Sequence, residues 1–254
     1  MPNAWIRKLS LFAPLSDADK QLIQQVCSLP RRVAARQDIV TEGETPDAVH
    51  LILEGFACRY KVLPTGERSI FAYLIPGDTC DWHVFILKRM DHSIGTLSAC
   101  TVVDIPRSKV LEITDNYPAI TRAMWFITLI DEATLREWIV NVSRRSAESA
   151  IAHLFCELLL RLETVGLRVG NGFELPITQT ELADTIGLST VHVNRVLQDL
   201  RQQGLIELRN KSLQLLNLEA LEKLAQFEPN YLHLGGGKVR QASYQPDNGS
   251  NGLR

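Results

Sequence analysis

The sequence predicts an α+β fold in which a small β-sandwich or barrel is followed by helices. Short runs of strand-forming residues fill roughly residues 31–107, and turn-forming glycines separate them. From Pro118 onward, apolar residues recur every three or four positions, which is the period of a helix. The separating glycines lie 11 or 12 residues apart, at Gly43, Gly55, Gly66 and Gly77.

The composition is that of an ordinary globular chain. Of the 254 residues, 45% are hydrophobic and 22% charged, so a core of useful size is available. The formal net charge of −2 means that any nucleic-acid surface must be a local patch. No apolar run approaches the length of about 18 residues that spans a membrane, and residues 1–10 lack the apolar segment of a signal peptide. We therefore expect no membrane contact and a cytoplasmic location.

The cysteines do not form a metal-binding or disulfide pattern. They include no CxxC pair and have no zinc-ligand spacing, so we expect reduced thiols and no metal site. Cys58, Cys80 and Cys100 are typical of core residues, with a redox switch as the alternative. The five cysteines are Cys27, Cys58, Cys80, Cys100 and Cys156.

Residues 1–116 are expected to form the first domain. A short amphipathic helix is predicted over residues 16–29. Alternating or continuous apolar runs then predict strands, including 49–53, 69–75 and 100–105. Short strands at this spacing are typical of a sandwich or barrel.

Residues 117–142 are predicted to form a long helix. Because this helix is apolar around much of its circumference, one stripe can pack on its own domain while another meets a second subunit. The alternative is a core helix buried within one chain. The residues expected at the dimer contact are Ile120, Ala123, Ile127, Ile130 and Thr134.

Residues 143–228 contain the most informative motif. Thr178 followed by Glu181 is a capping box that opens a helix, and Gly187 is suited to end it. Ser189 then caps a second helix, whose apolar residues recur at positions that face inward. Two short helices joined by such a turn form a helix-turn-helix, so this region is predicted to bind double-stranded DNA.

The outward face of the second helix carries side chains that suit DNA recognition. An arginine can pair with guanine, an asparagine with adenine, and a valine can meet the methyl group of thymine. The alternative is a solvated face of a small helical domain. The expected base-reading residues are Thr190, Val191, Asn194 and Arg195, and the expected phosphate contacts are Thr178, Gln179, Ser189, His192, Arg209 and Lys211.

A hairpin, or wing, is predicted after the second helix. Two alternating runs, 204–209 and 212–216, flank the turn Asn210-Lys211. Over residues 141–228, Lys and Arg number 9 against 11 Asp and Glu, so attraction to phosphate must come from a few local cations and helix N-termini.

The segment 229–254 is predicted to be a disordered tail. It contains Gly235-Gly236-Gly237 and a mixture of Gln, Asn, Ser and Gly. Such a composition buries too little apolar surface to offset the entropy of ordering the chain.

The order of these parts resembles the Crp/Fnr family of bacterial transcription regulators. The resemblance covers roughly residues 11–226 and is most specific over residues 175–206. It implies that the barrel is a double-stranded β-helix, or jelly roll, that senses an effector. It further implies that the long helix forms a homodimer, which binds a palindromic operator and contacts RNA polymerase.

The sequence departs from the family's cyclic-nucleotide motif. The Pro76-Gly77-Asp78 turn is present, but Asp81-Trp82 stands where the family has Gly-Glu, and His92-Ser93 where it has Arg-Ser. A bulky Trp and an acid at this place disfavour a cyclic phosphate, so we do not expect cAMP as the ligand. An unknown small effector remains open. The candidate effector pocket consists of Asp81, Trp82, His83, His92 and Ser93.

Other cofactors have little support in the sequence. Iron-sulfur members of the family carry an N-terminal cysteine cluster, whereas this chain has only Cys27 in its first fifty residues, so we expect no such cluster. A haem or metal ligand among His50, His83 and His92 is the minor alternative to a structural role.

Two other kinds of protein are weighed against a regulator. A ligand-binding or interaction module of the same fold that no longer binds DNA is the alternative function. An enzyme is disfavoured because the chain has no Gly-rich phosphate loop, metal-ligand cluster or nucleophile elbow.

Overall fold

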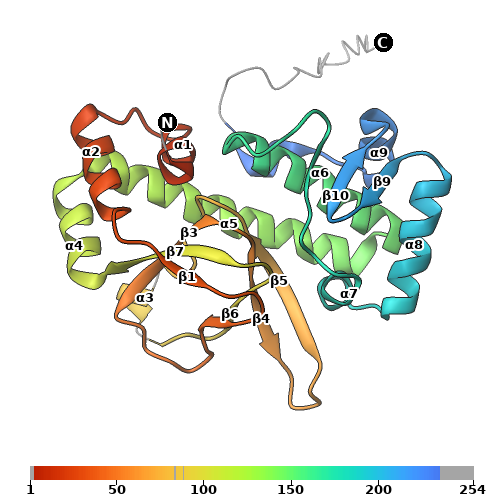
Figure 1. Ribbon diagram of the computed structural model, residues 1–254, viewed down its shortest axis with the longest axis horizontal. Helices are drawn as coiled ribbons and strands as arrows, with labels where there is room; N and C mark the ends of the chain where they lie inside the picture. Colours follow the sequence, from red (N-terminus) through yellow and green to blue (C-terminus); the bar gives the residue numbers. More distant parts are fainter. Residues whose placement is uncertain (1–2, 83, 88, 235–254) are drawn as a thin grey trace, which may run out of the picture.

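The computed structural model describes residues 3–82, 84–87 and 89–234. Figure 1 shows a β-rich half and a mainly helical half, with one long helix, α5 (Pro118–Arg144), running through both. The α+β class predicted from the sequence is therefore confirmed. Within the described ranges, no helix combines the length and the apolar character needed to cross a lipid bilayer.

Two short helices precede the barrel. Helix α2 (Asp17–Val26) begins after Ser16, whose side chain forms a capping box with Asp19, as expected for the helix predicted here. Helix α1 (Ala4–Ser10) was not predicted, because seven residues give too short a periodic signal. Its Trp5 is fully buried, so tertiary packing on the barrel core stabilises it.

The barrel consists of two antiparallel sheets that enclose an apolar core. One sheet has the strand order β1-β7-β3 and the other β2-β6-β4-β5. Inward-facing residues of both sheets share one core with the first half of α5. The strands are β1 (Arg31–Val33), β2 (Asp38–Val40), β3 (Ala48–Glu54), β4 (Ala57–Val62), β5 (Arg68–Leu74), β6 (Ser93–Thr96) and β7 (Cys100–Pro106).

Helices α3 (Val84–Leu87) and α4 (Arg107–Asn116) complete the barrel domain, and α5 follows directly. Three of the five residues predicted at the dimer contact of α5 are wrongly assigned. Ile120, Ala123 and Ile127 are at most 5% exposed, because they pack into the barrel core of their own chain. Ile130 and Thr134, also predicted at the dimer contact, are half-buried.

The C-terminal half is built on helix α6 (Ala147–Thr164), which is buried along most of its length. A second apolar core joins α6 to the elements that follow it and to the outer face of the β4–β5 hairpin. Its remaining elements are β8 (Gly172–Glu174), α7 (Gln179–Ile186), α8 (Thr190–Gln202), β9 (Ile206–Arg209), β10 (Ser212–Leu215) and α9 (Leu218–Ala225).

The first residues of the predicted disordered tail are ordered, so the prediction is wrong for residues 229–232. Pro229–Leu232 forms a 3₁₀ helix, in which Leu232 is 1% exposed and packs into the second core. The Tyr231 hydroxyl donates to Glu157 Oε2 at 3.0 Å. The ordering of this segment therefore comes from contacts with α6 and not from its composition. Residues 235–254, the rest of the predicted tail, lie outside the described ranges.

Two polar contacts tie the barrel to α7. Arg68 on β5 donates from Nε to Asp184 at 2.8 Å, and the Tyr73 hydroxyl lies 2.5 Å from Thr185 Oγ1. Tyr73 and Thr185 are both buried. Strand β5 and helix α7 are therefore joined by an apolar core and by hydrogen bonds.

A buried ion network joins the barrel to α6. Arg161 on α6 donates to Asp78 Oδ2 and to Glu157 Oε1, both at 3.0 Å, and to the Tyr73 carbonyl at 2.8 Å. Lys8 pairs with the other oxygen of Asp78. Burial raises the pKa of Asp78, whereas the nearby charges of Lys8 and Arg161 lower it. The lowering is the larger of the two effects, so the pKa of Asp78 lies below its usual value.

We expect Arg161→Met to lower the free energy of unfolding by about 3 kcal/mol, because it leaves two buried carboxylates without their shared cation. Arg168→Met is the matched control, since Arg168 pairs with the exposed Glu163 and its loss should cost less than about 1 kcal/mol. Urea unfolding of both variants measures the difference. Equal losses would contradict a special role for the buried network.

Candidate DNA-binding site

Helix α7 starts at the predicted capping box. Thr178 Oγ1 accepts from the Glu181 backbone N–H at 3.2 Å, and the Thr178 N–H donates to Glu181 Oε2 at 2.7 Å. The Thr178 hydroxyl also donates to Glu181 Oε2, at 2.9 Å. Thr178 therefore acts as a helix cap in this structure, and its contact with a DNA phosphate stays a prediction.

Gly187 ends α7 in the way the sequence predicts. Its φ of 72° and ψ of 35° lie in the left-handed region, and its N–H donates to the Ala183 carbonyl. Side chains with a Cβ rarely adopt this conformation. The turn sets the direction in which the next helix starts.

Helix α8 buries one face and exposes the other. Its apolar residues pack into the second core, including Val193 and Leu197, which are fully buried. Ser189 caps the helix by accepting from the His192 N–H at 3.2 Å, which leaves the Ser189 hydroxyl hydrogen free to donate. His192 is exposed on the first turn.

The predicted base-reading residues lie together on the outward face of α8. Thr190, Val191 and Arg195 are exposed, and the 67% exposure of Val191 is unusual for an apolar side chain. Asn194 is half-buried, and its Oδ1 lies 3.5 Å from Gln179 Nε2 on α7. A helix that presents short polar, apolar and guanidinium groups in this way has the surface required for the major groove.

The wing is present as predicted. Strands β9 and β10 pair in register, and β8 adds a third strand. Asn210 and Lys211 have φ values of 49° and 63°, the backbone of a two-residue hairpin turn. Arg209 and Lys211 are exposed at the tip, where Arg209 also pairs with Glu207 at 2.7 Å.

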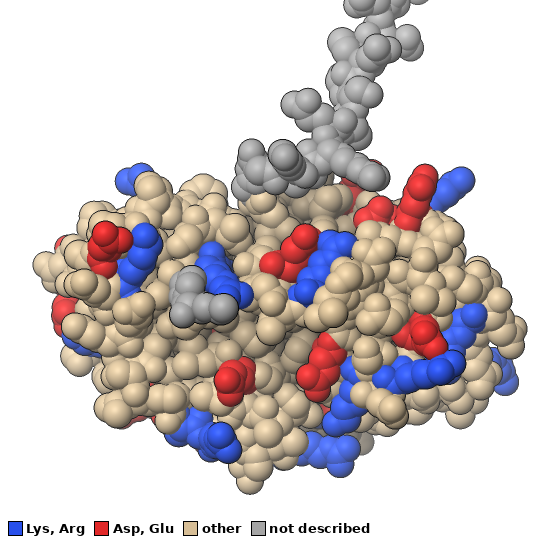
Figure 2. Space-filling model, turned by 45° about the horizontal axis from the view of Figure 1, so that its top comes forward, with Lys and Arg blue, Asp and Glu red and all other residues tan. Residues whose placement is uncertain are grey.

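Charges of both signs are mixed on one face of the molecule. Figure 2 shows Lys and Arg side chains interspersed with Asp and Glu on one face, with a short band of Lys and Arg near its lower edge. This distribution agrees with the expectation that electrostatic attraction to DNA is local.

The predicted effector pocket is largely filled by the protein itself. Asp81 is fully buried, and its carboxylate accepts from the His50 N–H at 2.8 Å and lies 2.6 Å from His50 Nδ1. Both oxygens are thus engaged within the barrel. Among the described residues, no group of three or more His, Cys, Asp and Glu side chains is arranged to hold a metal ion.

The other described members of that pocket are also packed against the protein. Ser93 is buried, and its Oγ accepts from the Glu42 N–H at 2.9 Å. His92 is buried against Phe71 and lies 2.7 Å from an Asp91 oxygen. Trp82 is partly buried against the barrel core, and His83 lies outside the described residues.

The barrel cysteines are core residues. Cys58, Cys80 and Cys100 are at most 2% exposed. Burial raises the pKa of the Cys58 thiol to about 12 and that of Cys100 to about 11, and it raises the pKa of Cys80 as well. Because the thiolate is the reactive form, these environments do not favour a redox switch.

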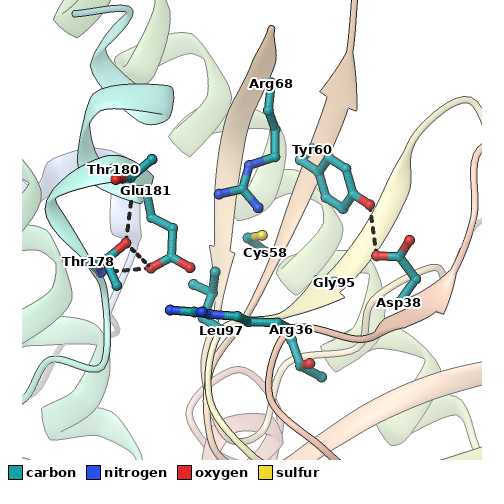
Figure 3. Close-up of a pocket in the computed structure, with 11 residues that line it drawn as sticks. Arg36, Asp38, Cys58, Tyr60, Arg68, Gly95, Leu97, Thr178, Thr180 and Glu181 are labelled. Carbon is teal, nitrogen blue, oxygen red and sulfur yellow. Dashed lines mark hydrogen bonds between the residues drawn. The ribbon is translucent and has the colours of Figure 1, made fainter. Parts of the chain in front are cut away.

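A cavity that was not predicted lies between the barrel and α7 (Figure 3). Its volume is about 520 Å³. Its walls come from segments far apart in the sequence, which is why no local motif indicates it. The lining residues that carry polar groups include Arg36, Asp38, Tyr60, Arg68, Thr178 and Glu181.

Comparison with known proteins agrees with both halves of the fold. The family described as cyclic nucleotide-binding domain matches residues 30–117, and the Crp-like helix-turn-helix domain matches residues 151–224. The transcriptional activatory protein AadR of Rhodopseudomonas palustris is 26% identical over 87% of this chain and 90% of its own length. The transcriptional activator protein FnrL of Cereibacter sphaeroides is 26% identical over 81% of this chain and 83% of its own.

A solved structure supports the same arrangement. FixK2 from Bradyrhizobium japonicum has a TM-score of 0.70 and 22% sequence identity, over 77% of this chain and 96% of that chain. A cyclic-nucleotide-binding type of barrel joined to a winged helix-turn-helix defines a DNA-binding transcription regulator. This chain belongs to the Crp/Fnr family of such regulators.

We expect Gly187→Val to lower the free energy of unfolding by about 1–2 kcal/mol, since valine is strained at a positive φ. Gly187→Asn should lose less, because asparagine tolerates the left-handed conformation. Urea unfolding distinguishes the two variants. Equal losses would mean that backbone strain at this turn does not control stability.

Proposed function

We propose that the protein acts as a homodimer whose two α8 helices read the half-sites of a palindromic operator. The exposed face of α8 supports this proposal most directly, because four side chains suited to base edges lie together on it. Gln179, Ser189, His192, Arg209 and Lys211 then serve as the phosphate contacts.

The exposed face of α5 is the proposed dimer interface. Apolar side chains recur along the exposed surface of this helix and flank the Glu132–Arg136 ion pair. Exposure of so many apolar side chains to water is unfavourable. They become buried when a second helix packs against them. The exposed apolar residues are Trp125, Phe126, Leu129, Leu135, Ile139, Val140 and Val142.

The mechanism follows from the two faces of α5. One face belongs to the barrel core, so a change in the barrel is transmitted to the helix. The other face sets how two subunits are rotated relative to each other. That rotation sets the spacing of the two α8 helices, which must be about 34 Å to reach successive major grooves.

The remaining partners are proposed from membership of the family. A transcription regulator acts where the chromosome and RNA polymerase are found, so we place it in the bacterial cytoplasm with polymerase as a partner. The internal pairing of Asp81 with His50 argues against cAMP as the effector, since it keeps a carboxylate, which repels a phosphate, at this place. The alternative, an interaction module that no longer binds DNA, predicts no operator at all.

Arg195→Ala should weaken binding to the selected operator by roughly 5- to 150-fold, the effect of losing one bidentate contact to guanine. The operator is first recovered by selection from random duplex DNA, and binding is measured by fluorescence anisotropy. Lys223→Ala removes the same charge from the exposed surface of α9 and should leave the affinity nearly unchanged. Failure to recover any palindrome would favour the interaction module.

Leu129→Asp should convert the dimer to monomers, because it places a charge on the proposed interface. Leu29→Asp is the control, since Leu29 is 87% exposed and is not part of α5. Analytical ultracentrifugation measures the mass of each variant. A Leu129→Asp protein that stays dimeric would refute this interface. Ile127→Asp is not a suitable test, because Ile127 lies in the core of its own subunit.

A further inference from the structure

The cavity between the barrel and α7 has the size of a small-molecule site. Its volume of about 520 Å³ falls within the range of ordinary ligand pockets. The four-stranded sheet of the barrel forms one wall, and the first turn of α7 forms the other.

Arg36 lines this cavity and provides a cation that no described residue bonds through its side chain. Its side chain takes part in no hydrogen bond or ion pair with the described residues, and Figure 3 shows its guanidinium extended across the cavity toward α7. The backbone of Arg36 has a φ of 61°, a conformation that residues other than glycine seldom adopt. Strain of this kind is often found where a side chain is held for binding.

Arg68 provides a second cation with unused donors. Its Nε donates to Asp184, whereas its two Nη atoms make no hydrogen bond within the described part of the chain. The guanidinium lies 5.7 Å from the centre of the Tyr60 ring. In Figure 3 the guanidinium groups of Arg36 and Arg68 both point toward Glu181.

Two carboxylates in the cavity each have one oxygen that accepts no hydrogen bond from the described residues. Glu181 is only 5% exposed, and both cap bonds from Thr178 go to its Oε2. Its Oε1 accepts nothing from the described residues. Asp38 accepts from the Tyr60 hydroxyl at 2.7 Å through Oδ1, and its Oδ2 is likewise available. These oxygens accept from hydroxyl or amino groups.

We propose that this cavity binds a small organic anion that also carries hydroxyl groups, such as a sugar phosphate or a hydroxy acid. Its phosphate or carboxylate lies between Arg36 and Arg68, and its hydroxyls donate to Glu181 and Asp38. Guanidinium groups bind both kinds of anion through charge-assisted hydrogen bonds.

Such a ligand connects the barrel directly to the DNA-reading helices. Glu181 and Thr178 begin α7, and Gln179 between them contacts Asn194 on α8. A ligand held by both walls favours the docked position of α7 over any position in which the walls separate. This consequence for DNA rests on the proposed function, but ligand binding itself does not.

The test is isothermal titration calorimetry without DNA, on the full chain. The probes are ribose 5-phosphate and citrate, with ribose as the uncharged control. Both anions should bind and ribose should not. Arg36→Gln should weaken binding about tenfold or more, because it removes a charge-assisted contact. Arg32→Gln is the matched control, as Arg32 is exposed on the neighbouring strand β1 and does not line the cavity.

Three outcomes would overturn the proposal. The first is that neither anion binds at millimolar concentration, and the second is that Arg36→Gln and Arg32→Gln bind equally well. The third is loss of binding in Arg195→Ala, which would place the anion on the DNA-facing surface instead. Thermal unfolding confirms that each variant is folded. Operator binding without added anion is measured separately, so failure of the cavity proposal leaves the DNA-binding proposal intact.

Discussion

The contact of Arg161 with Asp78 and Glu157 determines how the halves of this protein are joined. The Arg161 guanidinium donates to Asp78, in a turn of the barrel, and to Glu157 on α6. Glu157 in turn accepts from Trp138 on α5 and from Tyr231 near the C-terminal end of the described chain. Because each partner is buried, separating them exposes unpaired charge to a poorly solvating interior. The barrel, α5 and α6 therefore have a defined relative position.

Helix α5 has two apolar faces, and one of them packs within its own chain. The face that includes Ile127 completes the barrel core, so it is unavailable to another subunit. The opposite face, with Leu129 and Ile139 more than half exposed, is the one left for association. A helix that is apolar on two sides can thus transmit an event in the barrel to a neighbouring subunit without any loop between them.

The local parts of this fold could be predicted from the sequence, whereas the relations between distant parts could not. The cap at Thr178, the turn at Gly187 and the hairpin at Asn210 depend on a few adjacent residues, and all are present. Periodicity revealed that α5 is apolar on several sides but not which side meets the barrel, so Ile127 was wrongly placed at the dimer contact. The cavity between Arg36 and Glu181 depends on tertiary packing alone.

The hydrogen bonds of Tyr73 with Thr185 and of Arg68 with Asp184 limit how domains of this protein can be exchanged with those of another regulator. The DNA-reading module is not an independent unit on a linker, since its first helix shares an apolar core with the β4–β5 hairpin. A chimera that exchanges residues 143–234 for those of another regulator would place foreign side chains against that hairpin. Strands β4 and β5 must therefore be exchanged together with the module, so the working boundary of the DNA-reading module runs through the barrel.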